Sequence, residues 1–444
     1  MMKFLTIAFL LLCIPFVNAQ NNQAIRLTTK LNNTYHLEQQ SDSDVYLYIS
    51  LLGNELKTEK KRAPLNISLV LDRSGSMSGE KLENAKKAMN FVIDQLSATD
   101  YLSIVAYDNM IEVKSPSALV KNKDALKQKV NEITARGSTN LFDGMMKGFD
   151  EVLANKKEGF VNRVLLVSDG LANIGTIAPA TINEKVKLKF NQTGIGVSTF
   201  GVGADFNEDL MTSIAENGKG NYYFIDTASK IPAIFAKELD GLLSVVAQQT
   251  NLQINYPKNL KVEKVFGYNY TDTNNIVTVQ LNDIYSNEEK EVMVHFKIIQ
   301  PIQDKITIKS QVDFTDAQLD KTDKVSAENN LTTTVDTILY KQNIDSLVDE
   351  MVVVYNTTEM MDKAMQEIDK GNYIVGNDWA TKADGYVSAN YYRTKTGKVQ
   401  KQKITISKYK EDVKDIDKKS AYEKKMLQKS NKQMNYDIKK NKKE

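Results

Sequence analysis

The stretch "NISLVLDRSGSMSGEKLENAKKAM", residues 66–89, combines the two patterns that decide the fold. It opens with a nearly continuous run of apolar and small residues, which is typical of a strand buried on both faces. From Leu82 onward, apolar side chains recur at the spacing of one helical face. Between the two patterns lie one acidic residue, Asp72, and two hydroxyl side chains, Ser74 and Ser76. The stretch therefore predicts a buried strand that leads through a polar loop into an amphipathic helix.

The same alternation of strand and helix recurs along residues 63–245. Further buried strands are predicted at residues 101–107, 163–169, 197–203 and 222–225. Helical spacing returns at residues 124–133, 141–153, 208–216 and 231–243. Apolar strands that alternate with amphipathic helices predict a doubly wound α/β fold, in which helices cover both faces of a mostly parallel sheet.

The pattern changes on both sides of this α/β unit. Residues 20–62 and 246–335 alternate apolar and polar side chains between turn residues, which is typical of antiparallel strands. The first set is too short to form its own core, so we expect it to pair with the second in a β-sandwich-like domain that contains the α/β unit as an insertion. Residues 336–395 predict a helical region with a methionine-containing apolar stripe, which we interpret as core packing. Residues 396–444 form a Lys-rich tail, expected to be helical in patches or loose.

The N-terminus has the pattern of a secretory signal peptide over residues 1–19. Lys3 is followed by an apolar run at residues 4–16, and small residues end at Ala19, after which we expect cleavage. The apolar run is shorter than the roughly 20 residues that a membrane-spanning helix needs, and no later segment is apolar enough to cross a membrane. We therefore expect a secreted or periplasmic protein. Cys13 is the only cysteine and leaves with the signal, so the mature chain is expected to form no disulfide.

Charge is distributed unevenly along the chain. The whole sequence carries +2, but residues 393–444 hold 18 basic and 7 acidic side chains, or +11, which leaves −9 for the rest. We interpret the basic tail as a solvated extension, with contact to an anionic envelope surface as the alternative. Tyr409, Tyr422 and Tyr436 are too widely spaced to form a stacking platform for bases, so no nucleic-acid partner is expected.

Oxygen-bearing side chains lie at the ends of three of the predicted elements. Asp72, Ser74 and Ser76 follow the first strand, Thr139 lies in a loop before a helix, and Asp169 ends another central strand. In a doubly wound sheet these loops open on the same edge, where binding sites are found. Carboxylate and hydroxyl oxygens suit Mg²⁺. For the first loop alone a helix cap is the competing interpretation, but convergence of three segments favours a metal site.

These five residues resemble the metal-ion-dependent adhesion site of a von Willebrand factor type A (VWA) domain. The resemblance implies that Ser74 and Ser76 bind a divalent cation directly and that Thr139 binds directly or through water. It implies that Asp72 and Asp169 hold the cation partly through water and orient the hydroxyls. Mg²⁺ is the expected ion, with Mn²⁺ and Ca²⁺ as alternatives.

The resemblance covers residues 64–243 and includes the segment "TFGVGADFNEDLMTSIAENGKGNYYFID". The flanking β-segments are similar to those of bacterial secreted proteins and inter-alpha-trypsin-inhibitor heavy chains that carry such a domain. The family implies that an Asp or Glu carboxylate from a protein partner fills an open position on the cation. The expected function is therefore adhesion or assembly; the alternative is a scaffolding envelope protein in which the metal only stabilises the loops.

Catalysis is not expected. A serine nucleophile needs a general base and an oxyanion hole. The sequence has two histidines, His36 and His295, and both fall in strand-patterned segments outside the α/β unit. We interpret them as surface or strand histidines. With two histidines and no cysteine in the mature chain, a structural zinc site is also unexpected.

Overall fold

The stretch that opened the analysis folds as a strand, a turn and a helix. The computed structural model describes residues 23–38, 44–56, 62–394 and 397–441. Strand β4 (Leu65–Asp72) is buried along its whole length, and the turn at Gly75–Met77 leads into α1 (Glu80–Gln95). The expected signal peptide lies outside the described residues.

Strand β4 is buried because it lies in the middle of a six-stranded sheet with the order β6-β5-β4-β7-β8-β9. The other strands are β5 (Tyr101–Tyr107), β6 (Ile111–Leu119), β7 (Val161–Ser168), β8 (Gly196–Val202) and β9 (Lys219–Ile225). All neighbours pair in parallel except β5 and β6, which are antiparallel. The expected doubly wound, mostly parallel sheet is confirmed.

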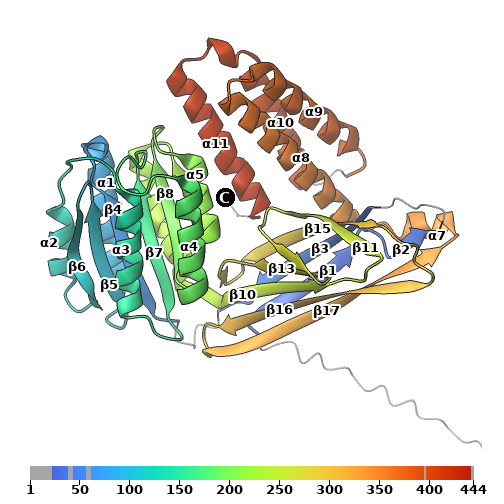
Figure 1. Ribbon diagram of the computed structural model, residues 1–444, viewed down its shortest axis with the longest axis horizontal. Coiled ribbons are helices and arrows are strands. Elements are labelled where there is room, and N and C mark those ends of the chain that lie inside the picture. The colour runs from blue at the N-terminus through green and yellow to red at the C-terminus, as the bar shows by residue number, and fades with distance from the viewer. Residues whose placement is uncertain (1–22, 39–43, 57–61, 395–396, 442–444) are drawn as a thin grey trace, which may run out of the picture.

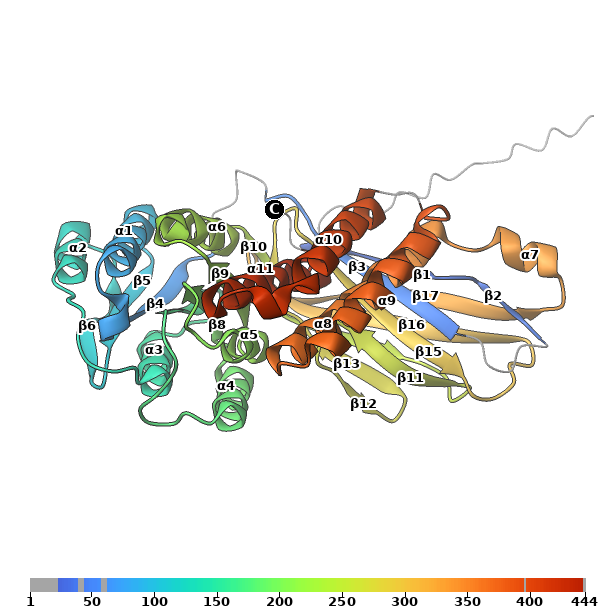
Figure 2. The same ribbon diagram turned by 90° about the horizontal axis from the view of Figure 1, so that it is seen from above.

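Helices cover both faces of this sheet, as Figures 1 and 2 show. One face packs against α1, α2 (Lys123–Asn131) and α6 (Ile231–Leu243). The other packs against α3 (Leu141–Ala154), α4 (Pro179–Thr193) and α5 (Glu208–Asn217). The polar loops therefore meet at the sheet edge, between two layers of apolar packing.

The α/β domain is inserted into a β-sandwich. The first sheet has the order β1-β3-β15-β11, and the second runs β12-β13-β10-β16-β17-β2, with β14 beside β10. The strands are β1 (Ile25–Leu31), β2 (Tyr35–Leu37), β3 (Asp44–Gly53), β10 (Val245–Asn255), β11 (Leu260–Phe266), β12 (Thr271–Thr273), β13 (Ile276–Gln280), β14 (Ile284–Tyr285), β15 (Glu289–Ile298), β16 (Lys305–Asp316) and β17 (Lys321–Thr334). Strand β3 pairs antiparallel with β15, with Ile49 opposite Val292. The N-terminal strands thus complete a core made mostly by residues that follow the insertion.

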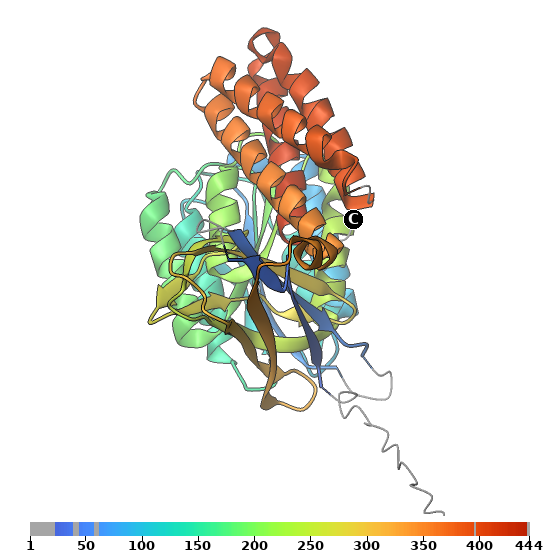
Figure 3. The same cartoon turned by 90° about the vertical axis from the view of Figure 1, so that its right-hand side faces the viewer.

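The C-terminal part is a helical bundle that stands beside both other parts (Figures 1 and 3). It follows α7 (Thr337–Gln342) and consists of α8 (Ser346–Asp369), α9 (Tyr373–Tyr391), α10 (Gly397–Lys414) and α11 (Ala421–Lys439). Met361 and Met365 lie in its core, as the core-packing interpretation expects. None of the helices in the described ranges is both long and apolar enough to cross a membrane.

The Lys-rich segment is a folded part of this bundle. Ile406 and Tyr409 of α10 are fully buried in the bundle core. On α11, Lys429 donates to the Phe206 carbonyl at 2.8 Å, and Lys432 pairs with Glu208 at 2.9 Å. The expectation of a solvated extension is therefore wrong for the described residues, because acidic groups more than 200 positions earlier bind these lysines.

Helix α11 also closes the exposed edge of the α/β sheet. The Gln433 side-chain oxygen accepts the N–H of Phe224, on edge strand β9, at 2.7 Å. Beside it, Tyr436 packs edge-on against Tyr222. An uncovered edge strand is a template for pairing with other chains, so this contact protects the sheet as well as docking the bundle.

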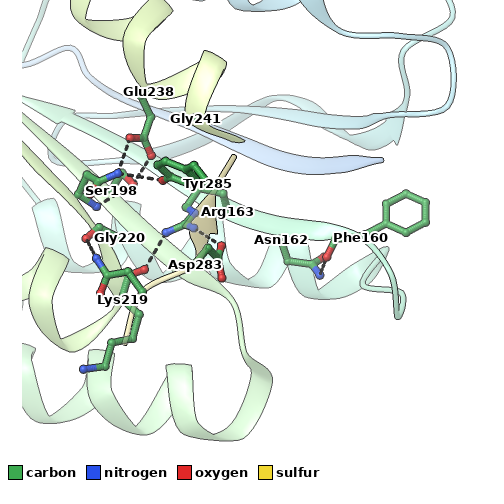
Figure 4. Close-up of polar contacts among 12 residues, drawn as sticks. Phe160, Asn162, Arg163, Ser198, Lys219, Gly220, Glu238, Gly241, Asp283 and Tyr285 are labelled. Carbon is green, nitrogen blue, oxygen red and sulfur yellow. Dashed lines mark hydrogen bonds and ion pairs between the residues drawn. The ribbon is translucent and has the colours of Figure 1, made fainter. Parts of the chain in front are cut away.

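A buried polar network joins the α/β domain to the sandwich (Figure 4). The Arg163 guanidinium on β7 is 1% exposed; it pairs with Asp283 at 2.5 Å and donates to the Lys219 carbonyl at 2.9 Å. Gly196 makes room for it, since a Cβ there would lie 2.5 Å from the guanidinium. Nearby, the buried Glu238 carboxylate of α6 accepts from three side chains: Ser198, Asn221 and Tyr223.

Arg163→Met is expected to lower the free energy of unfolding by about 3–5 kcal/mol, because it leaves the Asp283 carboxylate unpaired at the interface. Urea titration followed by circular dichroism measures the change. The control is Lys309→Met, which removes an exposed pair with Glu328 and should change little. Equal effects of the two substitutions would contradict a structural role for the Arg163 pair.

Candidate metal centre

The five residues predicted as metal ligands lie together at one edge of the α/β sheet. Asp72 is the last residue of β4, and Ser74 and Ser76 occupy the turn before α1. Thr139 precedes Asn140, whose side chain caps the N-terminus of α3. Asp169 follows β7, the parallel neighbour of β4. Three distant segments meet here because adjacent parallel strands end on the same side.

Direct contacts connect four of the five side chains to one another or to their loop. The Ser74 and Ser76 hydroxyl oxygens are 3.1 Å apart, and the Ser76 hydroxyl donates to Asp169 Oδ1 at 2.8 Å. The Ser74 backbone N–H donates to Asp72 Oδ1 at 2.8 Å. The other Asp72 oxygen accepts from the Ser168 hydroxyl at 2.6 Å. Each carboxylate therefore accepts at least one hydrogen bond from a neutral donor.

Gly170 brings Thr139 into the same cluster. A Cβ at this position would lie 3.2 Å from the Thr139 hydroxyl and 3.5 Å from the Ser76 hydroxyl. The glycine thus leaves open the space that these two oxygens share. The Thr139 loop is held by Asn173, whose side-chain oxygen accepts the Thr139 N–H at 2.9 Å.

The two carboxylates of the centre are buried, so a cation beside them would be electrostatically favourable. Asp72 and Asp169 have no exposed surface, whereas Ser76 is open to solvent. Burial raises the pKa of Asp72 from 3.8 to about 6, and hydrogen bonds from Ser168 and Ser74 only partly offset it. Two carboxylates and three hydroxyls are hard oxygen donors of the kind that Mg²⁺ prefers. The residues present therefore fit a small divalent cation.

Charged residues beside the centre, which sequence reasoning missed, join the loop that carries Ser74 and Ser76 to the loop that carries Thr139. Arg73 is nearly buried and points away from the centre, with its Nε 3.0 Å from an Asp108 oxygen. Arg136 reaches the same oxygen at 2.8 Å, and its backbone N–H donates to the Arg73 carbonyl at 2.7 Å. Although burial opposes it, these contacts lower the pKa of Asp108. The only sequence signal was the basic residue between Asp72 and Ser74.

Two further residues were not foreseen. Ser168, next to Asp169, orients Asp72 as described above. Lys81, in the first turn of α1, forms an ion pair with Asp169 and donates to the Ser76 carbonyl at 3.3 Å. Nothing in the spacing of the sequence separated this lysine from others on the same helix.

The histidines lie in the sandwich, away from this centre. His36 is buried on β2, and burial lowers its pKa. His295 on β15 contacts Asp44 at 2.7 Å and stacks on Tyr46. Across the described residues, no three His, Cys, Asp or Glu side chains gather as a metal site. The candidate centre differs from such sites because it relies on hydroxyl groups.

The comparisons with known proteins identify the α/β domain. Residues 66–237 match the family model "von Willebrand factor type A domain". The chain is 32% identical over 212 residues to the uncharacterized protein YfbK of Escherichia coli, a match that covers 47% of this chain and 36% of YfbK. It is 26% identical over 328 residues to the uncharacterized protein sll0103 of Synechocystis, covering 70% and 76%. The chain thus spans only about a third of YfbK.

Human inter-alpha-trypsin inhibitor heavy chain H3 is 25% identical over 210 residues, which cover 44% of this chain and 23% of that one. Two solved structures share the fold over most of the chain. A von Willebrand factor type A protein from Catenulispora acidiphila aligns with a TM-score of 0.68 and 14% identity, covering 84% of this chain and 89% of that one. The ArnB paralog VWA2 from Sulfolobus acidocaldarius aligns with a TM-score of 0.61 and 16% identity, covering 92% and 98%. The family model therefore identifies the α/β domain as a VWA domain, and VWA domains commonly mediate protein–protein interaction and adhesion.

The pKa of Asp72 predicts how stability depends on pH in the metal-free chain. A carboxyl whose pKa is raised by folding stabilises the fold below its unfolded pKa, and this contribution is lost as pH rises through the folded value. In EDTA, the free energy of unfolding of the wild type should therefore fall relative to that of Asp72→Asn by about 2 kcal/mol between pH 4 and pH 7. Urea titrations across this range measure it; parallel profiles for the two proteins would contradict the prediction.

Proposed function

We propose that this protein binds a divalent cation at the VWA domain and, through it, an acidic group of a protein partner. The observation that carries the proposal is the cluster of Ser74, Ser76, Thr139, Asp72 and Asp169 at the carboxyl edge of the sheet. The three hydroxyls would hold the cation, and the two carboxylates would orient them and balance its charge. When bound, the cation supplies a positive charge that a carboxylate from outside can neutralise.

The charge balance supports recognition of an acidic partner. Hydroxyl ligands are neutral, and the Asp169 carboxylate already shares its charge with Lys81. A divalent cation held here would remain under-neutralised, so an added carboxylate is favoured. The exposed position of Ser76 leaves this side of the centre accessible from solvent. The reaction class is binding, with no bond broken.

The proposed setting is adhesion or assembly outside the cytoplasm, secreted or periplasmic. The signal-peptide pattern at residues 1–19 supports this location. Mg²⁺ is the proposed ion, with Mn²⁺ and Ca²⁺ as the alternatives to compare. The competing role is a scaffold in which the metal only stabilises the loops, and such a scaffold would bind Mg²⁺ without binding the carboxylate of a partner.

Mg²⁺ binding is expected to depend on the serine hydroxyls. Isothermal titration of the EDTA-stripped chain with MgCl₂ should show one site, and the double variant Ser74→Ala/Ser76→Ala should bind at least about tenfold more weakly. The matched control is Ser78→Ala in the same loop, because the Ser78 hydroxyl donates to the Gly75 carbonyl at 2.7 Å instead. Unchanged affinity in the double variant would refute the ligand assignment.

Partner recognition is expected to require a carboxylate. Random peptides displayed on phage, selected on the immobilised chain in MgCl₂ and eluted with EDTA, should share an Asp or Glu. Replacing that residue by Asn or Gln should weaken binding at least about tenfold, as expected when one partner of a close charge pair is lost. If Mg²⁺ raises the melting temperature but no peptide binds in a carboxylate-dependent way, the scaffolding role is favoured.

A further inference from the structure

The candidate metal centre already contains a cation supplied by the chain itself. The Lys81 ammonium pairs with Asp169 Oδ2 and donates to the Ser76 carbonyl at 3.3 Å. The other Asp169 oxygen accepts the Ser76 hydroxyl at 2.8 Å. Both oxygens of this buried carboxylate are therefore engaged, one by the metal-binding loop and one by the lysine.

The position of Lys81 is defined by its surroundings. Its side chain is 31% exposed and runs along the β8–α5 loop, where a Cβ at Gly203 would lie 3.6 Å from Lys81 Cε and 3.7 Å from its Nζ. Gly203 has a positive φ of 78° and no side chain, so the loop passes close without blocking the lysine. The ammonium thus lies in a slot between the start of α1 and this loop.

The slot is fixed from the far side by the helical bundle. The Lys429 ammonium donates to the carbonyl of Phe206 in the same loop, and Lys425 pairs with Asp205 at 3.3 Å. These contacts join the loop to α11.

Two electrostatic consequences follow from this arrangement. A buried carboxylate without a partner is strongly unfavourable, so the ammonium stabilises the fold when no metal is bound. A divalent cation among the oxygens of Ser74, Ser76 and Asp169 would lie close to the same ammonium, and like charges repel in a poorly solvated site. The two cations thus compete for one negative charge.

We propose that Lys81 sets the affinity of this centre for divalent cations, acting as an internal counter-ion of Asp169 that opposes metal binding. The inference rests on the proposed metal-binding function. It differs from a supporting role, in which Lys81 would orient Asp169 toward the metal, because the two roles change affinity in opposite directions when the lysine is removed. Competition predicts tighter binding, and support predicts weaker binding.

The test uses the full chain, stripped with EDTA and titrated with MgCl₂ alone by calorimetry. Lys81→Met keeps the aliphatic length and removes the charge, and it should bind Mg²⁺ about tenfold more tightly than the wild type. Its melting temperature in EDTA should be lower than that of the wild type, and Mg²⁺ should restore it. Lys81→Arg keeps the charge and should retain wild-type affinity. Lys87 is an exposed lysine of the same helix, so Lys87→Met should change neither the Mg²⁺ affinity nor the melting temperature.

The outcomes separate this inference from the function on which it rests. Mg²⁺ binding by the wild type, with equal or weaker binding by Lys81→Met, would overturn the competing role and leave the metal centre standing. Binding by Lys81→Met alone would support the competition in its strongest form. Absence of Mg²⁺ binding in both folded proteins, checked by circular dichroism, would overturn the metal centre and the role of Lys81 together.

Discussion

Two carboxylates buried side by side at the ends of neighbouring strands are the constraint on which the VWA domain depends. Asp72 and Asp169 are brought together by the parallel pairing of β4 and β7 and have no exposed surface. Isolated buried charges are costly, so the surrounding groups are arranged to offset them: a backbone N–H, the Ser168 hydroxyl and the Lys81 ammonium. Any ligand that binds only the folded centre and adds positive charge stabilises the whole fold, because binding and folding are linked.

The three parts of the molecule are joined by both polar contacts and apolar packing. The Arg163–Asp283 pair and the hydrogen bond from the Asn221 side chain to the Tyr285 hydroxyl connect the VWA domain to the sandwich. Helix α11 joins the same domain to the bundle through Gln433 and Tyr436. These contacts require exact orientation, so the domain is held in one position relative to its neighbours instead of turning on a flexible linker. A partner bound at the centre would therefore meet a fixed surface that includes the β8–α5 loop and the adjoining end of the bundle.

Sequence patterns predicted the fold class well because it follows from local periodicity. The continuous apolar strands and the helical spacing of α1, α3 and α6 are strong signals. Four of the five candidate ligands lie at or just after the ends of two strands that the parallel sheet brings together, and Thr139 precedes α3. Helix α4 was missed because it buries only Ile182, Val186 and Thr193, which gives a weak apolar stripe. Strand β6 was missed because it is a half-exposed edge strand that contains Pro116.

The remaining failures concern charges whose partners lie far away in the sequence. The lysines of α11 looked like a solvated tail, since nothing local shows that Glu208 is their partner. For the same reason Lys81 could not be distinguished from Lys86 or Lys87 by spacing. Local sequence patterns indicate which face of a helix or strand is apolar. They do not indicate which distant side chain will pair with a charged residue on that element.

The insertion of the VWA domain has a consequence for biosynthesis. Strand β3 pairs with β15, so Ile49 cannot form its pair until Val292 has been synthesised. At about 5–20 residues per second, translation of the residues between them takes roughly 10–50 seconds. During this time β1 and β3 have no sandwich core, while all strands and covering helices of the VWA domain, residues 65–243, are synthesised first. The nascent chain therefore carries an unpaired hydrophobic hairpin ahead of a finished domain.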